Sequence, residues 1–407
     1  MAVSEKTALR HQKWKREILE IIRTTPDASR ISVKRARGLS MDSTLALIGE
    51  LLDEGLILSR GKTESGRVGR RATLLQINPD GCYFIGVRFS AGGISGVCMD
   101  FAHRVVCHRR LSLPAKPGKQ DMIDGVTRCI ELLMEELGAQ RCARLRGIGL
   151  GAPGIIDPQQ GVITRYVHIS GWENVPLREI VERRFGLPTY LEHGVKCTAR
   201  AVMSRPEHAA SRDLLFLQMG RGVSLCTVIG GRIHSGVSYL SGEIGHMLCA
   251  GRETLESLTA SDALCAAVQR ALAKGDSAFD PALYAGGVTL RSIVSAAQAG
   301  DSGACALMQQ AGRAAGCALS AAIMVVNPQD VILSGRLCCA DAFKAAVDDA
   351  LHRRCIPESL ACMQLSFLPS DAQLDAAGAA MLPYNKLFSV SRGEADSAAA
   401  GDAQEEN

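Results

Sequence analysis

The chain has 407 residues, 47% of them hydrophobic, which is enough for about two or three domains with well-formed cores. No run of about 18 apolar residues without a charge occurs, so we expect no membrane-spanning helix. The N-terminus has no apolar h-region, so we expect no secretory signal either. The 15 cysteines form no C-x-x-C pair, and we expect reduced, buried thiols in a cytoplasmic protein. Residues 1–80 hold 15 Lys and Arg against 10 Asp and Glu, whereas the rest holds 31 against 32. This local positive charge indicates a nucleic-acid-binding region.

Three short helices are predicted near the N-terminus. Apolar residues at helical spacing predict helices over residues 12–23 and 31–37, the second stopped at Gly38. Ser40 is a suitable N-cap for a third helix that ends at Gly55. Residues 56–59 and 72–77 follow as strands, joined by a basic loop at 60–71. The pattern predicts a winged helix-turn-helix DNA-binding domain.

The third helix would enter the major groove, but its start at 41–46 offers no Arg, Asn or Gln for paired base contacts. The wing and the second helix are richer in cations for phosphates. We expect DNA contacts from these residues: Lys34, Arg35, Arg37, Ser40, Met41, Asp42, Ser43, Arg67, Arg70 and Arg71. A basic helical dimerisation domain is the alternative.

From residue 81 onward the pattern is α/β. Strands are predicted at 83–89, 94–100, 105–113, 147–150, 214–219, 224–229 and 331–333, and helices at 121–137, 255–273 and 304–326. Two α/β lobes fit this order. We expect a DNA-binding domain at 1–80, a small lobe at 81–200 plus 368–388, a large lobe at 201–367, and a disordered acidic tail at 389–407.

Glycine-rich motifs in the body, together with one in the N-terminal region, are typical of a known protein family. They read Gly-Leu-Gly-Ala-Pro-Gly at 149–154, Gly-Arg-Gly at 220–222 and Gly-Glu-Ile-Gly-His at 242–246; the N-terminal region contributes Gly-Arg-Arg-Ala-Thr-Leu-Leu at 69–75. In this combination the chain resembles the ROK family (repressors, open reading frames and kinases), with regulators of the xylose and N-acetylglucosamine repressor type. The resemblance runs from about residue 12 to 388 and implies an actin/hexokinase-like, two-lobed sugar-kinase body.

Compared with the kinases of that family, the phosphoryl-transfer residues are missing. The carboxylate base that such chemistry needs is replaced by Gly194, and Arg88 stands in place of the Asp that opens the first phosphate loop. In that loop, Ser90 and Ala91 replace two glycines. The second loop, at 220–226, has gained side chains at two glycine positions. We therefore predict no catalytic residues, no cofactor and no enzyme activity, with a residual sugar kinase as a minor alternative.

The metal site of the family is also incomplete. Relatives use the imidazole of Glu-x-Gly-His with a following cysteine cluster, but here only His246 and Cys249 remain, and tetrahedral zinc needs four ligands. We predict no metal.

A sugar site is still implied by the resemblance, at His193, Glu243, His246 and Glu256. Carboxylate and imidazole groups bind sugar hydroxyls. Two alternatives remain: Glu243 caps a helix, and His246 is an ordinary core histidine.

Together these features predict a cytoplasmic transcriptional regulator, and a repressor rather than an activator. Its partners would be operator DNA, a small carbohydrate and a second copy of the chain in a homodimer or higher oligomer, with helix 304–326 at the interface. Sugar in the cleft between the lobes would alter the spacing of two DNA-binding heads. The alternative is a regulator that has lost small-molecule sensing and responds to a protein partner.

Overall fold

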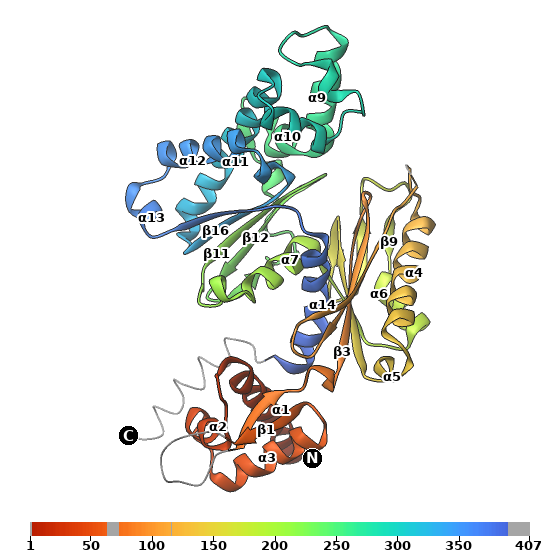
Figure 1. Cartoon of the computed structure of the whole chain (residues 1–407), viewed down its shortest axis with the longest axis vertical. Coiled ribbons are helices and arrows are strands. Elements are labelled where there is room, and N and C mark those ends of the chain that lie inside the picture. Colours follow the sequence, from red (N-terminus) through yellow and green to blue (C-terminus); the bar gives the residue numbers. More distant parts are fainter. Residues whose placement is uncertain (1, 63–72, 115, 390–407) are drawn as a thin grey trace. The chain divides into compact units, whose positions relative to one another are not determined.

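The computed structural model describes residues 2–62, 73–114 and 116–389. The chain divides into two compact units: Met1–Thr198 with Gln373–Asn407, and Ala199–Ala372 (Figure 1). The predicted tail lies outside the described residues from 390 onward.

The first unit begins with three helices and a two-stranded sheet. These are α1 (Ala2–Thr24), α2 (Arg30–Arg37), α3 (Met41–Asp53), β1 (Ile57–Lys62) and β2 (Thr73–Ile77), with β1 and β2 antiparallel. Ser40 caps α3 as predicted, accepting a hydrogen bond from the Ser43 amide at 3.1 Å. Helix α1 starts ten residues before the predicted Gln12 boundary. Buried residues on all three helices, including Ile18, Val33 and Leu51, form a common core.

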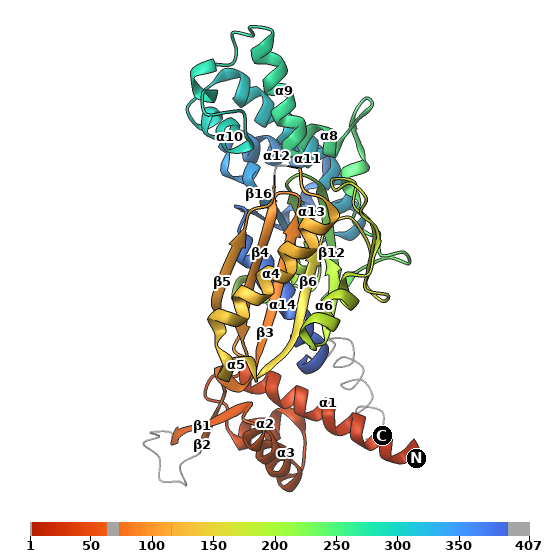
Figure 2. The same cartoon turned by 90° about the vertical axis from the view of Figure 1, so that its right-hand side faces the viewer.

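The remainder of this unit is a five-stranded sheet in the order β10-β6-β3-β4-β5. Its strands are β3 (Tyr83–Ser90), β4 (Gly93–Asp100), β5 (Val105–Leu111), β6 (Leu145–Ala152) and β10 (Thr189–His193). Strand β6 runs parallel to both β3 and β10, and β3-β4-β5 is an antiparallel meander. Helices α4 (Lys119–Leu137) and α6 (Leu177–Phe185) cover one face and α14 (Ala372–Phe388) the other (Figures 1 and 2). A short helix α5 (Ala139–Cys142) and a small sheet of β7 (Ile155–Asp157), β8 (Val162–Arg165) and β9 (Glu173–Val175) complete it.

Helix α14 packs backbone against backbone on the sheet. A Cβ atom added to Gly86 of β3 would overlap the Ala376 carbonyl oxygen, and one added to Gly149 of β6 would overlap that of Ala379. No side chain fits between helix and strands at these two positions. The glycines therefore fix how closely α14 approaches the sheet.

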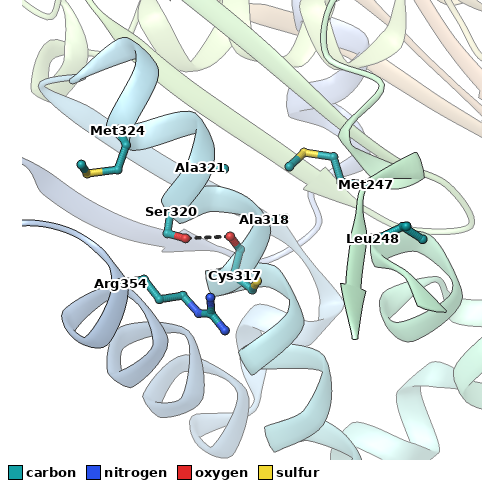
Figure 3. A pocket seen from close by; sticks show the side chains of 8 residues that line it. All are labelled: Met247, Leu248, Cys317, Ala318, Ser320, Ala321, Met324 and Arg354. Carbon is teal, nitrogen blue, oxygen red and sulfur yellow. Dashed lines mark hydrogen bonds between the residues drawn. The ribbon is translucent and has the colours of Figure 1, made fainter. Parts of the chain in front are cut away.

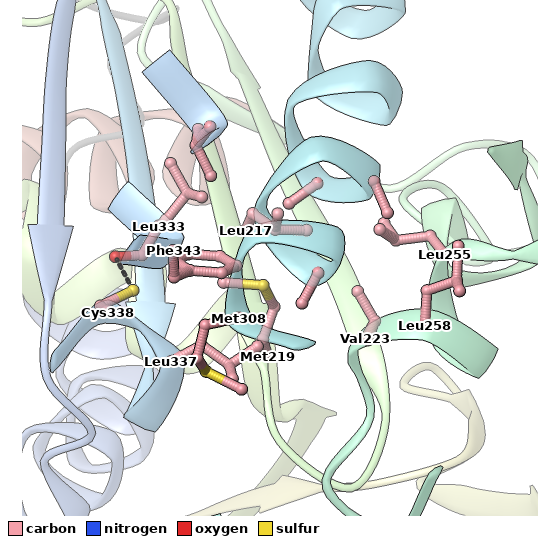
Figure 4. Packing of buried hydrophobic residues seen from close by; sticks show 14 of the residues in the cluster. Leu217, Met219, Val223, Leu255, Leu258, Met308, Leu333, Leu337, Cys338 and Phe343 are labelled. Atoms are coloured by element: carbon pink, nitrogen blue, oxygen red, sulfur yellow. Dashed lines mark hydrogen bonds between the residues drawn. The ribbon is translucent and has the colours of Figure 1, made fainter. Parts of the chain in front are cut away.

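The second unit is also an α/β layer. Its sheet has the order β13-β12-β11-β16-β17, built from β11 (Leu214–Met219), β12 (Val223–Ile229), β13 (Arg232–His234), β16 (Asp330–Gly335) and β17 (Gln364–Leu368). Helices α11 (Ser302–Val326) and α12 (Asp341–Arg354) pack together and contribute to the core shown in Figure 4. Helices α10 (Leu290–Gln298) and α13 (Pro357–Ala361) lie in the same unit. The helix predicted over 255–273 is divided at Ala260 into α8 (Leu255–Thr259) and α9 (Ser261–Ala273).

Among the residues that the structure describes, none of the helices combines the length and the apolar character needed to cross a membrane.

Candidate functional site

The Gly-Glu-Ile-Gly-His segment at 242–246 lies against the backbone of β12 in the second unit. The Leu225 amide donates to the Gly242 carbonyl at 2.8 Å. Gly242 has a φ of +97°, and a Cβ there would overlap the Leu225 carbonyl oxygen. A Cβ on Gly245 would lie 2.8 Å from the Val223 carbonyl oxygen. The two glycines are therefore required for the segment to lie this close to the strand.

This packing presents the two predicted polar side chains to solvent. Glu243 and His246 are both exposed; Glu243 precedes the single helical turn η3 (Ile244–His246), and His246 is its last residue. The Glu243 side chain makes no capping hydrogen bond to η3, and His246 is not in the core. The core-histidine alternative is therefore wrong, whereas Glu243 does stand at the N-cap position of η3.

Glu256, in the first turn of α8, has a different position. It is half-buried, and its Oε2 accepts a hydrogen bond from the Val223 amide at 3.0 Å, at the start of β12. The same oxygen would be 3.3 Å from a Cβ on Gly245. The structure thus brings Glu256 next to the Glu243–His246 segment, where it holds the residue that follows the Gly-Arg-Gly turn.

After this segment the chain forms a two-stranded ribbon of β14 (Leu248–Ala250) and β15 (Glu253–Thr254). Here the Cys249 thiol hydrogen-bonds the Met247 carbonyl at 3.6 Å. Within the described residues, no three His, Cys, Asp or Glu side chains gather as metal ligands. The ribbon and α11 border a groove of about 560 Å³, whose lining includes Met247 and Leu248 from the ribbon side and Met324 from α11 (Figure 3).

In the first unit, two of the substituted kinase positions contact each other directly. A Cβ on Gly194 would overlap three guanidinium atoms of Arg88: Cζ, Nε and Nη2. The Arg88 Nη1 donates to the Phe89 carbonyl at 2.7 Å and approaches that of Gly151 at 3.4 Å. Arg88 therefore fills the space into which any side chain at position 194 would project.

The sheet register explains this contact. Arg88 on β3 and Glu192 on β10 are both register partners of Gly151, on the intervening β6. Gly151 has no side chain, and a Cβ there would lie 3.0 Å from Arg88 Cδ. The arginine can thus cross β6 and reach the start of α7 (Gly194–Met203).

His193 lies beside this arginine. Burial, reinforced by the charges of Arg88 and Lys196, lowers the pKa of His193 to about 3, so the imidazole is neutral near pH 7. Its Nδ1 is buried without a hydrogen-bond partner. Lys196 is 2% exposed and lies 3.9 Å from Glu192, whose Oε1 also accepts from the His193 amide at 2.8 Å. Sequence reasoning missed Lys196 and Glu192, because the pair joins the end of β10 to the first turn of α7 and no single periodicity covers both residues.

The β3–β4 turn, which corresponds to the first phosphate loop, has its amides engaged internally. The Ala91 amide donates to the Tyr166 hydroxyl at 2.9 Å, and the Gly92 amide to Ser90 Oγ at 3.2 Å. These are the backbone donors that a phosphate would need. The role of Tyr166 had no indication in the sequence.

The predicted DNA-contacting residues fall into three groups. Lys34 and Arg35 on α2 are exposed, as are Met41 and Asp42 at the start of α3. Arg37 instead forms an ion pair with Glu17 of α1, and the hydroxyls of Ser40 and Ser43 hydrogen-bond each other in the cap. The wing residues Arg67, Arg70 and Arg71 lie outside the described residues.

Comparison with known proteins identifies the family. The ROK family model matches residues 84–382. The chain belongs to the ROK family. It is 24% identical over 329 residues to the xylose repressor of Caldicellulosiruptor bescii, covering 78% of this chain and 82% of the relative. It is 24% identical to the DNA-binding transcriptional repressor Mlc of Escherichia coli K12, covering 87% and 88%.

Solved structures show the same fold. A ROK family transcriptional regulator, a homologue of E. coli MLC, superposes with a TM-score of 0.78 at 21% identity, covering 93% of this chain and 98% of the regulator. A ROK glucokinase from Streptomyces griseus, in complex with glucose and AMPPNP, gives a TM-score of 0.63 at 22% identity, covering 74% and 98%. The chain therefore has a ROK sugar-kinase-like body preceded by an N-terminal helical region.

Proposed function

We propose that this ROK-family chain is a DNA-binding transcriptional repressor whose kinase-like body binds a carbohydrate without phosphorylating it. The observation that carries the proposal is the occupation of the space at Gly194 by the Arg88 guanidinium. Phosphoryl transfer to a hydroxyl needs a carboxylate base within hydrogen-bond reach. Here a cation fills the base position, and its neighbour His193 has a pKa of about 3. The neighbouring turn at Ala91 and Gly92 has its amides engaged as well.

The N-terminal region is proposed to bind DNA as a winged helix-turn-helix, with α3 in the major groove and the loop after β1 as the wing. Exposure of Lys34 and Arg35 supports phosphate contacts from α2. We assign Arg37 to holding α2 against α1 through Glu17, and Ser40 to capping α3. The names of the two relatives, a xylose repressor and a DNA-binding transcriptional repressor, support the same assignment.

The carbohydrate contacts are proposed at Glu243, His246 and Glu256, which the second unit holds around one loop. Exposed carboxylate and imidazole groups on a rigid glycine-bounded segment can bind vicinal hydroxyls. A sugar contact from His193, in the first unit, stays a prediction of the sequence; its imidazole is neutral and its Nδ1 is buried without a hydrogen-bond partner.

Self-association through α11 is also part of the proposal. Met324 is 46% exposed and Val325 85% exposed at the end of this helix, and Leu248, 66% exposed, lines the adjacent groove together with the polar Ser320 and Arg354. Exposed apolar patches of this kind are typical of protein interfaces. A dimer would present two DNA-binding heads to two half-sites.

Calorimetric titration of the intact chain with monosaccharides tests the proposal, and a coupled assay for ADP release accompanies it. We expect heat from at least one sugar and none from the Glu243→Ala variant, with no sugar-dependent ADP release. Sugar-dependent ADP release that is lost in Glu243→Ala would overturn the proposal in favour of a kinase. Absence of heat from every sugar, with DNA binding intact, would favour the partner-responsive alternative.

A further inference from the structure

We propose that Arg23 positions the N-terminal helical region on helix α14, and that α14 connects this region mechanically to the start of α7 at Gly194. The inference deepens the proposed function, on which its regulatory meaning rests. The contacts that carry it all lie within the first unit.

Arg23 is in the last turn of α1, just before the chain continues to α2. Its guanidinium carbon lies 4.9 Å from the ring centroid of Tyr384 on α14 and 5.6 Å from that of Phe101, at the end of β4. Nη2 donates to the Phe101 carbonyl at 3.0 Å. The side chain is only 17% exposed. A guanidinium held over two aromatic rings with a directed hydrogen bond defines an orientation as well as a contact.

The surroundings of Arg23 are aromatic and neutral. The ring of His103, in the β4–β5 turn, lies 4.2 Å from that of Tyr384, and Phe388 lies 4.9 Å from Phe101. Burial, with a contribution from the Arg23 charge, lowers the pKa of His103 to about 3. Burial raises the pKa of Tyr384 to about 12. Arg23 thus lies among aromatic rings and a neutral imidazole, and it forms an ion pair of 3.9 Å with Glu20 on its own helix.

The opposite end of α14 contacts α7. The Thr198 hydroxyl lies 2.7 Å from Asp375 Oδ1 and 3.2 Å from the carbonyl oxygen of Gly194. A Cβ on Gly378 would overlap the Cys197 carbonyl oxygen, so the two helices meet backbone to backbone. The first turn of α14 is therefore tied to the turn of α7 that begins at the Arg88–Gly194 contact.

Between these ends α14 is pressed onto the sheet at Gly86 and Gly149 without an intervening side-chain layer, and Pro383 lies against Gly147. Figure 1 shows α14 extending from beside α7 toward α1. Side chains that could change rotamer and absorb a displacement are absent at these contacts. A shift of α7 therefore moves α14 as a body, and Arg23 passes that shift to α1.

Hydrogen exchange of the intact chain, without DNA or sugar, tests this inference. We expect Arg23→Ala to speed amide exchange in the last two turns of α1 by about tenfold or more, because the helix end is released from its docking site. Arg23→Lys, which keeps the charge but lacks the planar guanidinium, should restore the protection only in part. Arg10→Ala is the matched control, since Arg10 stacks on Trp14 of the same helix at 4.9 Å; it should leave the end of α1 unchanged.

A second hydrogen-exchange experiment changes the contact between the first turn of α14 and α7. The variant is Thr198→Val, which removes the hydroxyl between Gly194 and Asp375. We expect faster exchange at the end of α1 in this variant, and no additional effect when Arg23→Ala is already present. If Arg23→Ala behaves like Arg10→Ala, Arg23 is not a positioning residue. If Thr198→Val speeds amide exchange only at the start of α14, this helix does not transmit a displacement from α7 to α1. Neither result depends on DNA binding, so failure of the proposed function would be recognised separately by DNA titration.

Discussion

Helix propensity and the contact with Arg88 predict opposite effects on stability when Gly194 is replaced with alanine. Gly194 begins α7, and helix propensity alone predicts that alanine there stabilises the fold by up to about 1 kcal/mol. The structure predicts the reverse, because the new Cβ would overlap the Arg88 guanidinium. Overpacking costs about 1–3 kcal/mol, and displacement of Arg88 weakens its bonds to the Phe89 and Gly151 carbonyls, which are worth about 1.5–3 kcal/mol each when the donor is charged. We expect a net destabilisation of about 1–3 kcal/mol after partial relaxation.

Thermal unfolding of the Gly194→Ala variant measures whether the substitution stabilises or destabilises the fold. For a unit of this size, 1 kcal/mol corresponds to a shift of about 2–4 °C in Tm, so we expect a decrease of roughly 2–12 °C. Gly49→Ala is the matched control, because Gly49 lies within α3 with no atom within 4 Å of its Cβ position; it should raise stability. In the Arg88→Ala background, Gly194→Ala should become neutral or stabilising. A stabilising effect of Gly194→Ala in the wild-type background would refute the proposed filling of this space by Arg88.

Three further predictions follow from the sites. Removing the charges of Lys34 and Arg35 together should weaken binding to a random-sequence duplex and reduce the slope of log K against log salt by about 1.8, measured by fluorescence anisotropy. Gly242→Ala should destabilise the fold by about 3 kcal/mol or more in thermal unfolding, because overlap and left-handed strain add, whereas Gly251→Ala, at a φ of +60° with open space, should cost only about 1 kcal/mol. His193→Asn should reduce the loss of stability on acidification, measured by urea unfolding between about pH 6.5 and 4.

The sign of the last prediction follows from linkage. The folded-state pKa of His193, about 3, lies below the unfolded value of about 6.5, so the unfolded chain binds more protons between these values. The stability contributed by the neutral imidazole is complete above about pH 6.5 and falls as the pH decreases toward 3. An unchanged pH dependence in His193→Asn would contradict the assigned pKa. For the DNA prediction, Arg353→Ala on α12 is the control; an equal change in salt slope there would contradict the assignment of α2 to phosphate contacts.

Local patterns in the sequence predicted much of the fold. The Ser40 cap, the glycine stop at Gly38 and the strand β16 follow from nearest-neighbour chemistry and appear where expected. The break at Ala260 could not be predicted, because the apolar spacing continues through it; the structure turns the chain there, where Ser261 donates to the Gly220 carbonyl at 2.8 Å. That contact is with a residue far away in the sequence.

In the candidate site, too, the sequence predicted local features but not contacts between residues that are far apart in the chain. The glycine spacing at 242–246 indicated a constrained loop, and the structure shows why each glycine is needed. Arg88 and Gly194 could each be recognised as unsuited to kinase chemistry, but their direct contact depends on the order β10-β6-β3 and on Gly151 between them. Strand order is not encoded in local periodicity. The aromatic docking site of Arg23 likewise joins segments more than 350 residues apart, Arg23 and Tyr384.

The central claim is that the body binds a sugar at Glu243 but does not phosphorylate it. Calorimetry of the intact chain with a panel of monosaccharides and their phosphates, repeated with Glu243→Gln, tests this most directly. The account predicts saturable heat from at least one member, lost in Glu243→Gln and unaffected by the addition of ATP and Mg²⁺. Heat that persists in Glu243→Gln, or that grows with ATP turnover, would contradict it.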